Sequence, residues 1–402
     1  MFKLIKNNST IRLFLLMDLL SSFSVGSIST GANWFVLKEG GSNAILSLFL
    51  AINVISSFIF APKIGHLVDT ISRKKSMMLS FLFRSIVFFG VSISILSNYV
   101  VLPSMFLLSS VFGIGWMMYY SSSRSFLQQN VQKEELGVAN SFLEITLQCG
   151  MFISGGITGY LLEKISYGII LLVATCMLIV TMIIANNLNE GKIYTNNSAI
   201  KETDNNKEKT KLKINKKVIS IAIFTMIPLF IIQVYNVTMP GYISNILHGG
   251  SSAYGTSDML YGIGGLFSGI IVSKLVNKFE NRQLLFGGFS VLFLSFTLLF
   301  FNKTLITLFI LAFIIGLCNS GTKIIANTVM MENIENKFMG RMSTFITAIS
   351  QISSLIITLS VGLLNDKLGE NFSFIIILFF VLGGWLLTTS INKGLKLSDS
   401  NM

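Results

Sequence analysis

Twelve apolar stretches dominate this sequence, and short polar segments separate them. About 20 apolar residues are needed to cross the hydrocarbon core of a bilayer, and each stretch comes close to that length or exceeds it. Only 12% of the residues are charged, about half of the roughly 25% usual in soluble domains. The sequence therefore predicts an all-α membrane protein with twelve transmembrane helices, at residues 11–37, 43–66, 77–96, 103–129, 138–162, 168–187, 217–246, 253–276, 284–301, 305–327, 341–364 and 372–391.

The basic residues mark one side of the membrane. Of the 30 Lys and Arg, the odd-numbered connections hold only Lys38, Lys164, Lys303 and Lys367. Because basic residues accumulate in cytoplasmic loops, we expect a multi-pass plasma-membrane protein with both termini in the cytoplasm. The net charge of +12 therefore indicates membrane orientation and no nucleic-acid partner.

A polar segment divides the chain into two sets of six spans. Between Asn189 and Lys217 the sequence turns to Asn, Lys, Glu and Thr, a composition that buries too little apolar surface to fold alone. We predict two pseudo-symmetric six-helix bundles joined by a cytoplasmic linker, with boundaries at 1–188, 189–216 and 217–402.

The two halves also repeat weakly, at an offset of 202 to 204 residues. Gly65 and Asp69 recur as Gly269 and Ser273, and Gly113 recurs as Gly316. The pairs Asn140-Ser141 and Glu163-Lys164 correspond to Met342-Ser343 and Asp366-Lys367. Coincidence in a biased composition is the alternative to duplication.

The stretch Gly65-His66-Leu67-Val68-Asp69-Thr70-Ile71-Ser72-Arg73-Lys74-Lys75 is too polar for a bilayer core, so we expect a tight cytoplasmic turn. Its pattern resembles the loop between helices 2 and 3 of the major facilitator superfamily. The resemblance implies that Asp69 latches against the start of span 11 when the inner gate is shut, with Thr70 and Ser72 departing from the family's Arg and Gly. The alternative is a carboxylate that merely caps a turn beside Arg73. The implied gate residues are Gly65, Asp69, Arg73, Lys74, Gly340 and Arg341.

Further stretches are similar to the drug:proton antiporter branch, which includes macrolide-efflux and enterobactin-exporter-like proteins. These are Arg84, the segment from Glu135 to Ser141, and a glycine-rich span 5 that lacks the branch's proline beside Gly155-Gly156. The resemblance implies proton-coupled export of a small amphipathic compound by alternating access. A uniporter or importer on the same fold, and a receptor-like subunit that transports nothing, are the alternatives.

Four charged residues fall inside spans, where charges are costly and usually functional. Asp18, Arg84, Arg124 and Glu144 lie five to eight residues from the predicted cytoplasmic ends, about 8–12 Å deep at 1.5 Å per residue. Arg124 and Glu144 are the expected ion pair, because a short loop joins their spans. Asp18 and Glu144 are the candidate proton carriers, although Asp18 could instead pair with an arginine or extend to the interface. Asp258 lies near the external start of span 8, where we expect it to stabilise the helix N-terminus, with a coupling role as the alternative.

A cargo site needs apolar walls with a few polar groups. The resemblance implies that spans 1, 4, 7 and 10 line the central cavity, although helix packing explains each candidate equally well. The candidates are Asn33, Trp34, Trp116, Tyr119, Tyr120, Gln233, Asn236, Asn319 and Gln351.

No enzyme signature is present. The chain has no phosphate-binding loop, and its two His and three Cys lack partners at metal-ligand spacing. We therefore expect no enzymatic activity, cofactor or metal, and the expected partners are a small-molecule substrate, protons and lipid around a monomer. The Lys-, Asn- and Ile-rich composition suggests a bacterial source.

Overall fold

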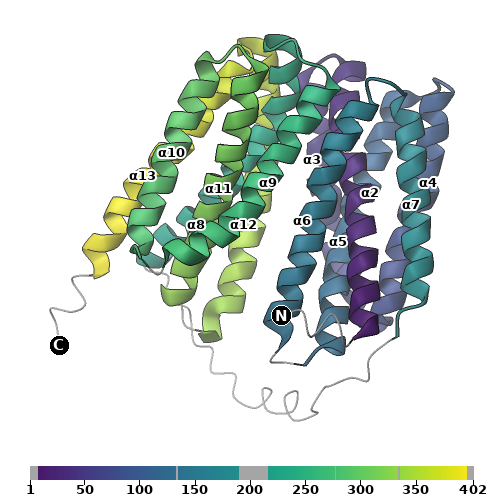
Figure 1. Ribbon diagram of the computed structural model, residues 1–402, viewed down its shortest axis with the longest axis horizontal. Coiled ribbons are helices and arrows are strands. Elements are labelled where there is room, and N and C mark those ends of the chain that lie inside the picture. Colours follow the sequence, from purple (N-terminus) through teal and green to yellow (C-terminus); the bar gives the residue numbers. More distant parts are fainter. Residues whose placement is uncertain (1–7, 133–134, 190–215, 277, 334–335, 396–402) are drawn as a thin grey trace.

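The computed structural model describes residues 8–132, 135–189, 216–276, 278–333 and 336–395, and these form an all-helical bundle (Figure 1). The long α-helices are α2 (Ser9–Gly40), α3 (Asn43–Thr70), α4 (Arg73–Leu96), α5 (Val101–Asn130), α6 (Leu136–Leu161), α7 (Tyr167–Asn186), α8 (Lys216–Gly241), α9 (Ser251–Leu275), α10 (Asn281–Phe301), α11 (Leu305–Asn333), α12 (Asn336–Leu368) and α13 (Asn371–Leu395). A π-helical turn, η2 (Tyr242–Ile246), extends α8.

Each predicted span coincides with one of these helices, so the predicted fold class is confirmed. Eleven helices of the described residues are long and apolar enough to cross a membrane. Helix α6 falls outside that group, and its sequence includes Glu144, Gln148 and several glycines. Its polar and small residues suit a helix that packs against α2 on one side and α9 on the other.

The two largest hydrophobic cores of the described residues divide the helices into halves. One core contains buried residues from 11 to 188, and the other contains residues from 224 to 381 together with Trp34. The predicted linker lies almost wholly in 190–215, outside the described residues, so the exact domain boundaries remain a prediction.

The proposed repeat has a structural counterpart in two glycines. A Cβ on Gly113 of α5 would lie 2.3 Å from the backbone oxygen of Asn53 on α3, and a Cβ on Gly316 of α11 would lie 2.0 Å from that of Tyr261 on α9. Only glycine permits so close an approach of two helix backbones. Corresponding helices therefore meet through the same kind of contact in both halves.

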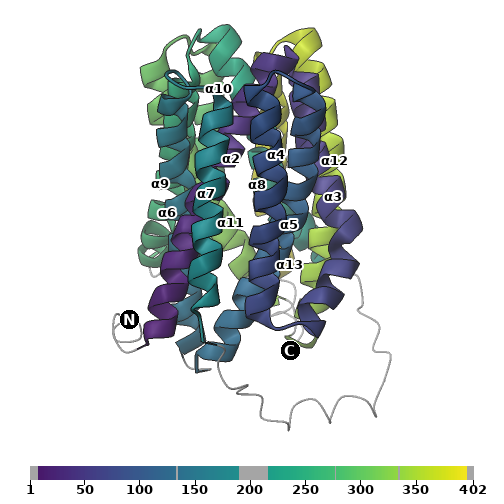
Figure 2. The same ribbon diagram turned by 90° about the vertical axis from the view of Figure 1, so that its right-hand side faces the viewer.

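The first and last helices define the names used here for the two ends of the bundle. Helix α2 begins and α13 ends on the same side, here called the terminal end, and the opposite side is the distal end (Figure 1). The halves contact each other along α3 with α12 and along α6 with α9, on opposite sides of the molecule (Figure 2). Toward the terminal end the two groups of helices diverge (Figure 1).

The predicted turn at Gly65–Lys75 is shorter than expected. Helix α3 continues to Thr70 and α4 begins at Arg73, so the connection consists of Ile71 and Ser72. Because Ser72 accepts a hydrogen bond from the backbone N–H of Lys75 and caps α4, the polar stretch can be mostly helical. The prediction of a turn across the whole stretch was wrong.

Candidate transport site

Asp18 of α2 is fully buried within the first half. Its Oδ2 accepts a hydrogen bond of 2.6 Å from the hydroxyl of Thr146 on α6, and its Oδ1 accepts one from the hydroxyl of Tyr119 on α5. No ion pair joins Asp18 to an arginine among the described residues. Burial rules out the extension of this side chain to the interface. A carboxylate held by two hydroxyls is therefore the arrangement found here.

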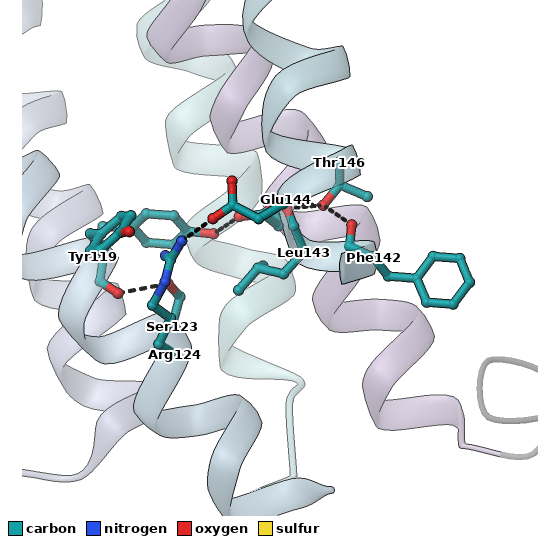
Figure 3. A network of polar contacts seen from close by, with 9 residues as sticks. Tyr119, Ser123, Arg124, Phe142, Leu143, Glu144 and Thr146 are labelled. Atoms are coloured by element: carbon teal, nitrogen blue, oxygen red, sulfur yellow. Dashed lines mark hydrogen bonds and ion pairs between the residues drawn. The ribbon is translucent and has the colours of Figure 1, made fainter. Parts of the chain in front are cut away.

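Arg124 of α5 forms an ion pair with Glu144 of α6, as expected (Figure 3). The guanidinium also lies 3.4 Å from the centre of the Tyr120 ring, a cation–π contact. The Glu144 side chain is 47% exposed and that of Arg124 is 25% exposed. The pair is therefore more accessible than the fully buried Asp18.

Arg84 of α4 is fully buried and has few polar partners. Its Nε donates to the backbone oxygen of Ser80 at 3.4 Å, whereas neither Nη1 nor Nη2 has a hydrogen-bond partner among the described residues. Its guanidinium carbon lies 5.4 Å from the ring centre of Phe81 and 6.0 Å from that of Tyr119. The guanidinium thus lies behind the tyrosine that holds Asp18.

Two carboxylates close the distal end by capping helices of the opposite half. Asp366, in the last turn of α12, accepts hydrogen bonds from the backbone N–H groups of Asn43 and Ala44 at the start of α3, at 2.7 and 3.0 Å. Glu163, after α6, accepts one of 3.2 Å from the backbone N–H of Ser252 at the start of α9. These two residues are the pair that recurs in the sequence. Glu163 and Asp366 serve equivalent roles on the two sides of the distal end, and we call these two residues the distal caps.

We expect alanine at both distal caps to open the distal end. An exposed helix cap contributes about 0.5–1 kcal/mol, so Glu163→Ala with Asp366→Ala should shift the closed-to-open ratio roughly 5- to 30-fold. Electron–electron resonance between spin labels at Tyr99 and Lys303, both exposed at the distal end, would measure the shift in a background without native cysteines. Exposed Glu39→Ala is the control, and an unchanged distance distribution in the double variant would contradict the role of the caps.

Asp258 departs from its predicted role. It lies in the middle of the first half of α9, beyond the first turn, which contains no acidic residue. Its Oδ2 accepts a 3.0 Å hydrogen bond from the hydroxyl of Thr30 on α2. Since spacing from a helix start does not reveal which neighbouring helix a side chain faces, the sequence alone did not place Asp258 between the two halves.

The cavity candidates separate into different environments. Tyr119 is buried against Asp18 and forms no part of a cavity wall, whereas Tyr120 is 41% exposed beside half-buried Trp116. Asn33 and Trp34 are buried against Tyr254 of the other half, at 3.3 Å to its hydroxyl and 5.8 Å between rings. In the second half, Gln233 donates to Thr358, Asn319 donates to Tyr261, and Asn236 and Gln351 are half-buried.

The predicted inner latch is not tested by the structure. The side chains of Asp69, Gly340 and Arg341 lie outside the described part of the chain, although the backbone places Asp69 in the last turn of α3 and the other two near the start of α12. Gly65 is helical with open space around it. Lys74 donates to the backbone oxygens of Asn186 and Leu188 at the end of α7, at 2.5 and 3.0 Å.

The described residues form twelve long helices in two halves, and eleven of these helices are apolar enough to cross a membrane, which defines a multi-pass membrane protein. The family model of the Major Facilitator Superfamily matches residues 14–356 and 221–394. The chain belongs to this superfamily, which implies a small-molecule substrate and a membrane setting.

Solved transporters share the fold at low sequence identity. The nucleoside transporter NupG matches with a TM-score of 0.71 at 13% identity, covering 96% of this chain and 100% of its own. A bacterial homologue of the iron transporter ferroportin, in an inward-facing state, has a TM-score of 0.75 at 14% identity, covering 95% of this chain and 98% of its own. A D-xylose-proton symporter matches with a TM-score of 0.74 at 12% identity, covering 95% of this chain and 96% of its own. No curated protein sequence matches the chain.

Proposed function

We propose that the protein is a proton-coupled exporter of a small amphipathic compound in the bacterial plasma membrane, with both termini cytoplasmic. The observation that carries this proposal is Asp18, a fully buried carboxylate whose hydrogen-bond partners are two hydroxyls. A hydroxyl can donate or accept. The site can therefore hold Asp18 with or without a proton and leave no polar atom unpaired.

The Arg124–Glu144 pair offers this proton a route from buried Asp18 toward a more exposed side chain. Glu144 is half exposed and shares helix α6 with Thr146, which bonds Asp18. The guanidinium of Arg124 positions its neighbours and is not the proton carrier. Protonation of Asp18 would loosen its attraction to Arg124 and allow α2, α5 and α6 to move relative to one another.

Alternating access would then proceed by rocking of the two halves. The distal caps and the contacts of α3 with α12 and α6 with α9 support a state closed at the distal end. In the proposed orientation that end faces outward, and cargo enters from the cytoplasm between the diverging helices. Asp69 with Gly340 and Arg341 would fasten the terminal end in the opposite state.

Transport in liposomes tests the proposal. Purified protein is reconstituted with a pH-sensitive dye inside, and a pH gradient is imposed in the presence of a panel of macrolides, other drugs and siderophores. We expect proton movement across the membrane to rise severalfold above protein-free vesicles when a true cargo is added. Uptake of a cargo with no proton counterflow would favour a uniporter or importer, and no flux with any compound would favour a receptor-like subunit.

A further inference from the structure

We propose that Arg84 is a positioning residue of the proton site and acts on Asp18 through the side chain of Tyr119. Its positive charge, held behind the tyrosine, favours the ionised carboxylate and so helps to set the pH at which Asp18 exchanges its proton. The inference rests on the proposed proton-coupled function and adds to it a residue that does not touch the carboxylate.

Arg84 is a buried charge with no countercharge in contact. The side chain is fully buried, and it forms no ion pair among the described residues. Its Nε donates to the backbone oxygen of Ser80 at 3.4 Å, and both Nη atoms lack hydrogen-bond partners in that part of the chain. Burial of a charge is costly unless other groups compensate it. An apolar side chain of similar length would pack α4 on α5 without this cost, so the charge itself calls for a function.

Gly115 of α5 lets the Arg84 side chain reach the tyrosine. A Cβ on Gly115 would lie 2.5 Å from Cδ and 2.6 Å from Cγ of Arg84, so glycine leaves room for the side chain to lie against α5. The hydroxyl of Ser80 donates to the backbone oxygen of Gly115 at 2.7 Å and fixes the two helices at this point. Tyr119 follows Gly115 by four residues and lies on the same face of α5. The guanidinium carbon of Arg84 is thereby held 6.0 Å from the centre of the Tyr119 ring.

Tyr119 links this cation to Asp18. Its side chain is fully buried, and its hydroxyl donates a hydrogen bond to Oδ1 of Asp18. Two other charged groups near this site, Arg124 of α5 and Glu144 of α6, form an ion pair with each other (Figure 3), so their charges largely offset one another. Among the described residues, Arg84 is then the cation left to balance the ionised carboxylate. A positive charge favours the ionised form of a carboxylate, and the attraction reaches further in a buried region than in water.

Infrared titration of the full-length protein in detergent tests the proposal. The carboxylic-acid band of Asp18 is identified by its absence in Asp18→Asn and is followed against pH. We expect Arg84→Met, which keeps the length of the side chain and removes its charge, to raise the midpoint of this band by about one pH unit. Arg84→Lys keeps the charge and should titrate close to the wild type. Arg282→Met removes an exposed arginine at the start of α10, and this matched control should titrate as the wild type does.

The same substitution in a Tyr119→Phe background shows whether Arg84 acts through the phenol. There Arg84→Met should move the midpoint by less than half as much, because the hydroxyl that joins the cation to Asp18 is absent. An equal shift in both backgrounds would overturn the role of Tyr119. A folded Arg84→Met variant with the wild-type midpoint, or an Arg84→Lys variant that titrates as Arg84→Met does, would overturn the role of the charge. Arg84→Gln is also neutral and provides the same comparison if Arg84→Met does not fold.

These outcomes can be told apart from those of the proposed function, because a titration at equilibrium needs neither cargo nor a pH gradient. A titrating band of Asp18 that Arg84→Met leaves unmoved would overturn only the role of Arg84. If the wild type shows no titrating band that Asp18→Asn removes, then Asp18 is not the proton carrier, and the proposed coupling fails together with this inference.

Discussion

Asp18→Asn is expected to abolish transport driven by a pH gradient, reducing cargo-dependent proton flux to that of empty liposomes. The amide cannot exchange a proton. Its oxygen can still accept a hydrogen bond from the Tyr119 hydroxyl, and its NH2 group can donate one to the Thr146 hydroxyl, and these two hydroxyls bond the carboxylate in the wild type. The fold and the cargo affinity should therefore remain within about threefold of the wild type. Parallel measurements of flux in liposomes and of cargo binding in detergent check both halves of this expectation.

Thr146→Val provides the matched control for Asp18→Asn. It removes one hydroxyl from the carboxylate and leaves the proton-exchanging group in place, so flux should fall only severalfold while its dependence on the pH gradient persists. Unimpaired flux in Asp18→Asn would exclude Asp18 from the coupling mechanism, and Glu144 would become the remaining candidate.

Gly159→Leu is expected to prevent closure of the distal end and to reduce transport at least tenfold. A Cβ at this position of α6 would lie 2.5 Å from the backbone oxygen of Ser251 and 2.7 Å from the Cα of Gly255 on α9. Both atoms are backbone atoms of the other half and cannot rotate away. Overpacking of this kind costs about 1–3 kcal/mol, and here the separation of the two halves relieves it. The spin-label distance between positions 99 and 303 should lengthen accordingly.

Gly287→Leu distinguishes this steric effect from a general intolerance of leucine. A Cβ at Gly287 of α10 meets no atom within 4 Å, so this variant should transport and close as the wild type does. If Gly159→Leu keeps the wild-type distance distribution, then the approach of α6 to α9 is not what determines distal closure.

Hydropathy predicted the helices well because each span must be apolar along its whole length. The predicted span at 253–276 is α9 at Ser251–Leu275, whereas the span predicted to end at 327 continues as α11 to Asn333. Polar boundary residues were less informative. Gly65 and Asp69 indicated a loop, but a helix can continue into the interface once a serine such as Ser72 caps its successor.

The sequence predicted which charged residues belong to the candidate site better than it predicted which residues they contact. The short connection between α5 and α6 was sufficient to predict the Arg124–Glu144 pair. The partners of Asp18 were not predictable, because Thr146 is one of many threonines and only the packing of α6 on α2 selects it. The prediction assigned Asp258 to a helix start because the packing of α9 against α2, which brings it to Thr30, was not visible in the sequence either. The recurrence of Glu163 in Asp366 was the one sequence signal that could have revealed the distal caps.

The distal caps recognise main-chain N–H groups, which every residue except proline provides. The strength of each cap consequently depends on the acid and on the position of the opposing helix, with little dependence on the side chains of that helix. A chain built this way can lose or regain a closure contact through one codon, with no matching change elsewhere. Variants at Glu163 and Asp366 thus offer a graded adjustment of how long the transporter dwells in one orientation, independent of the residues that select its cargo.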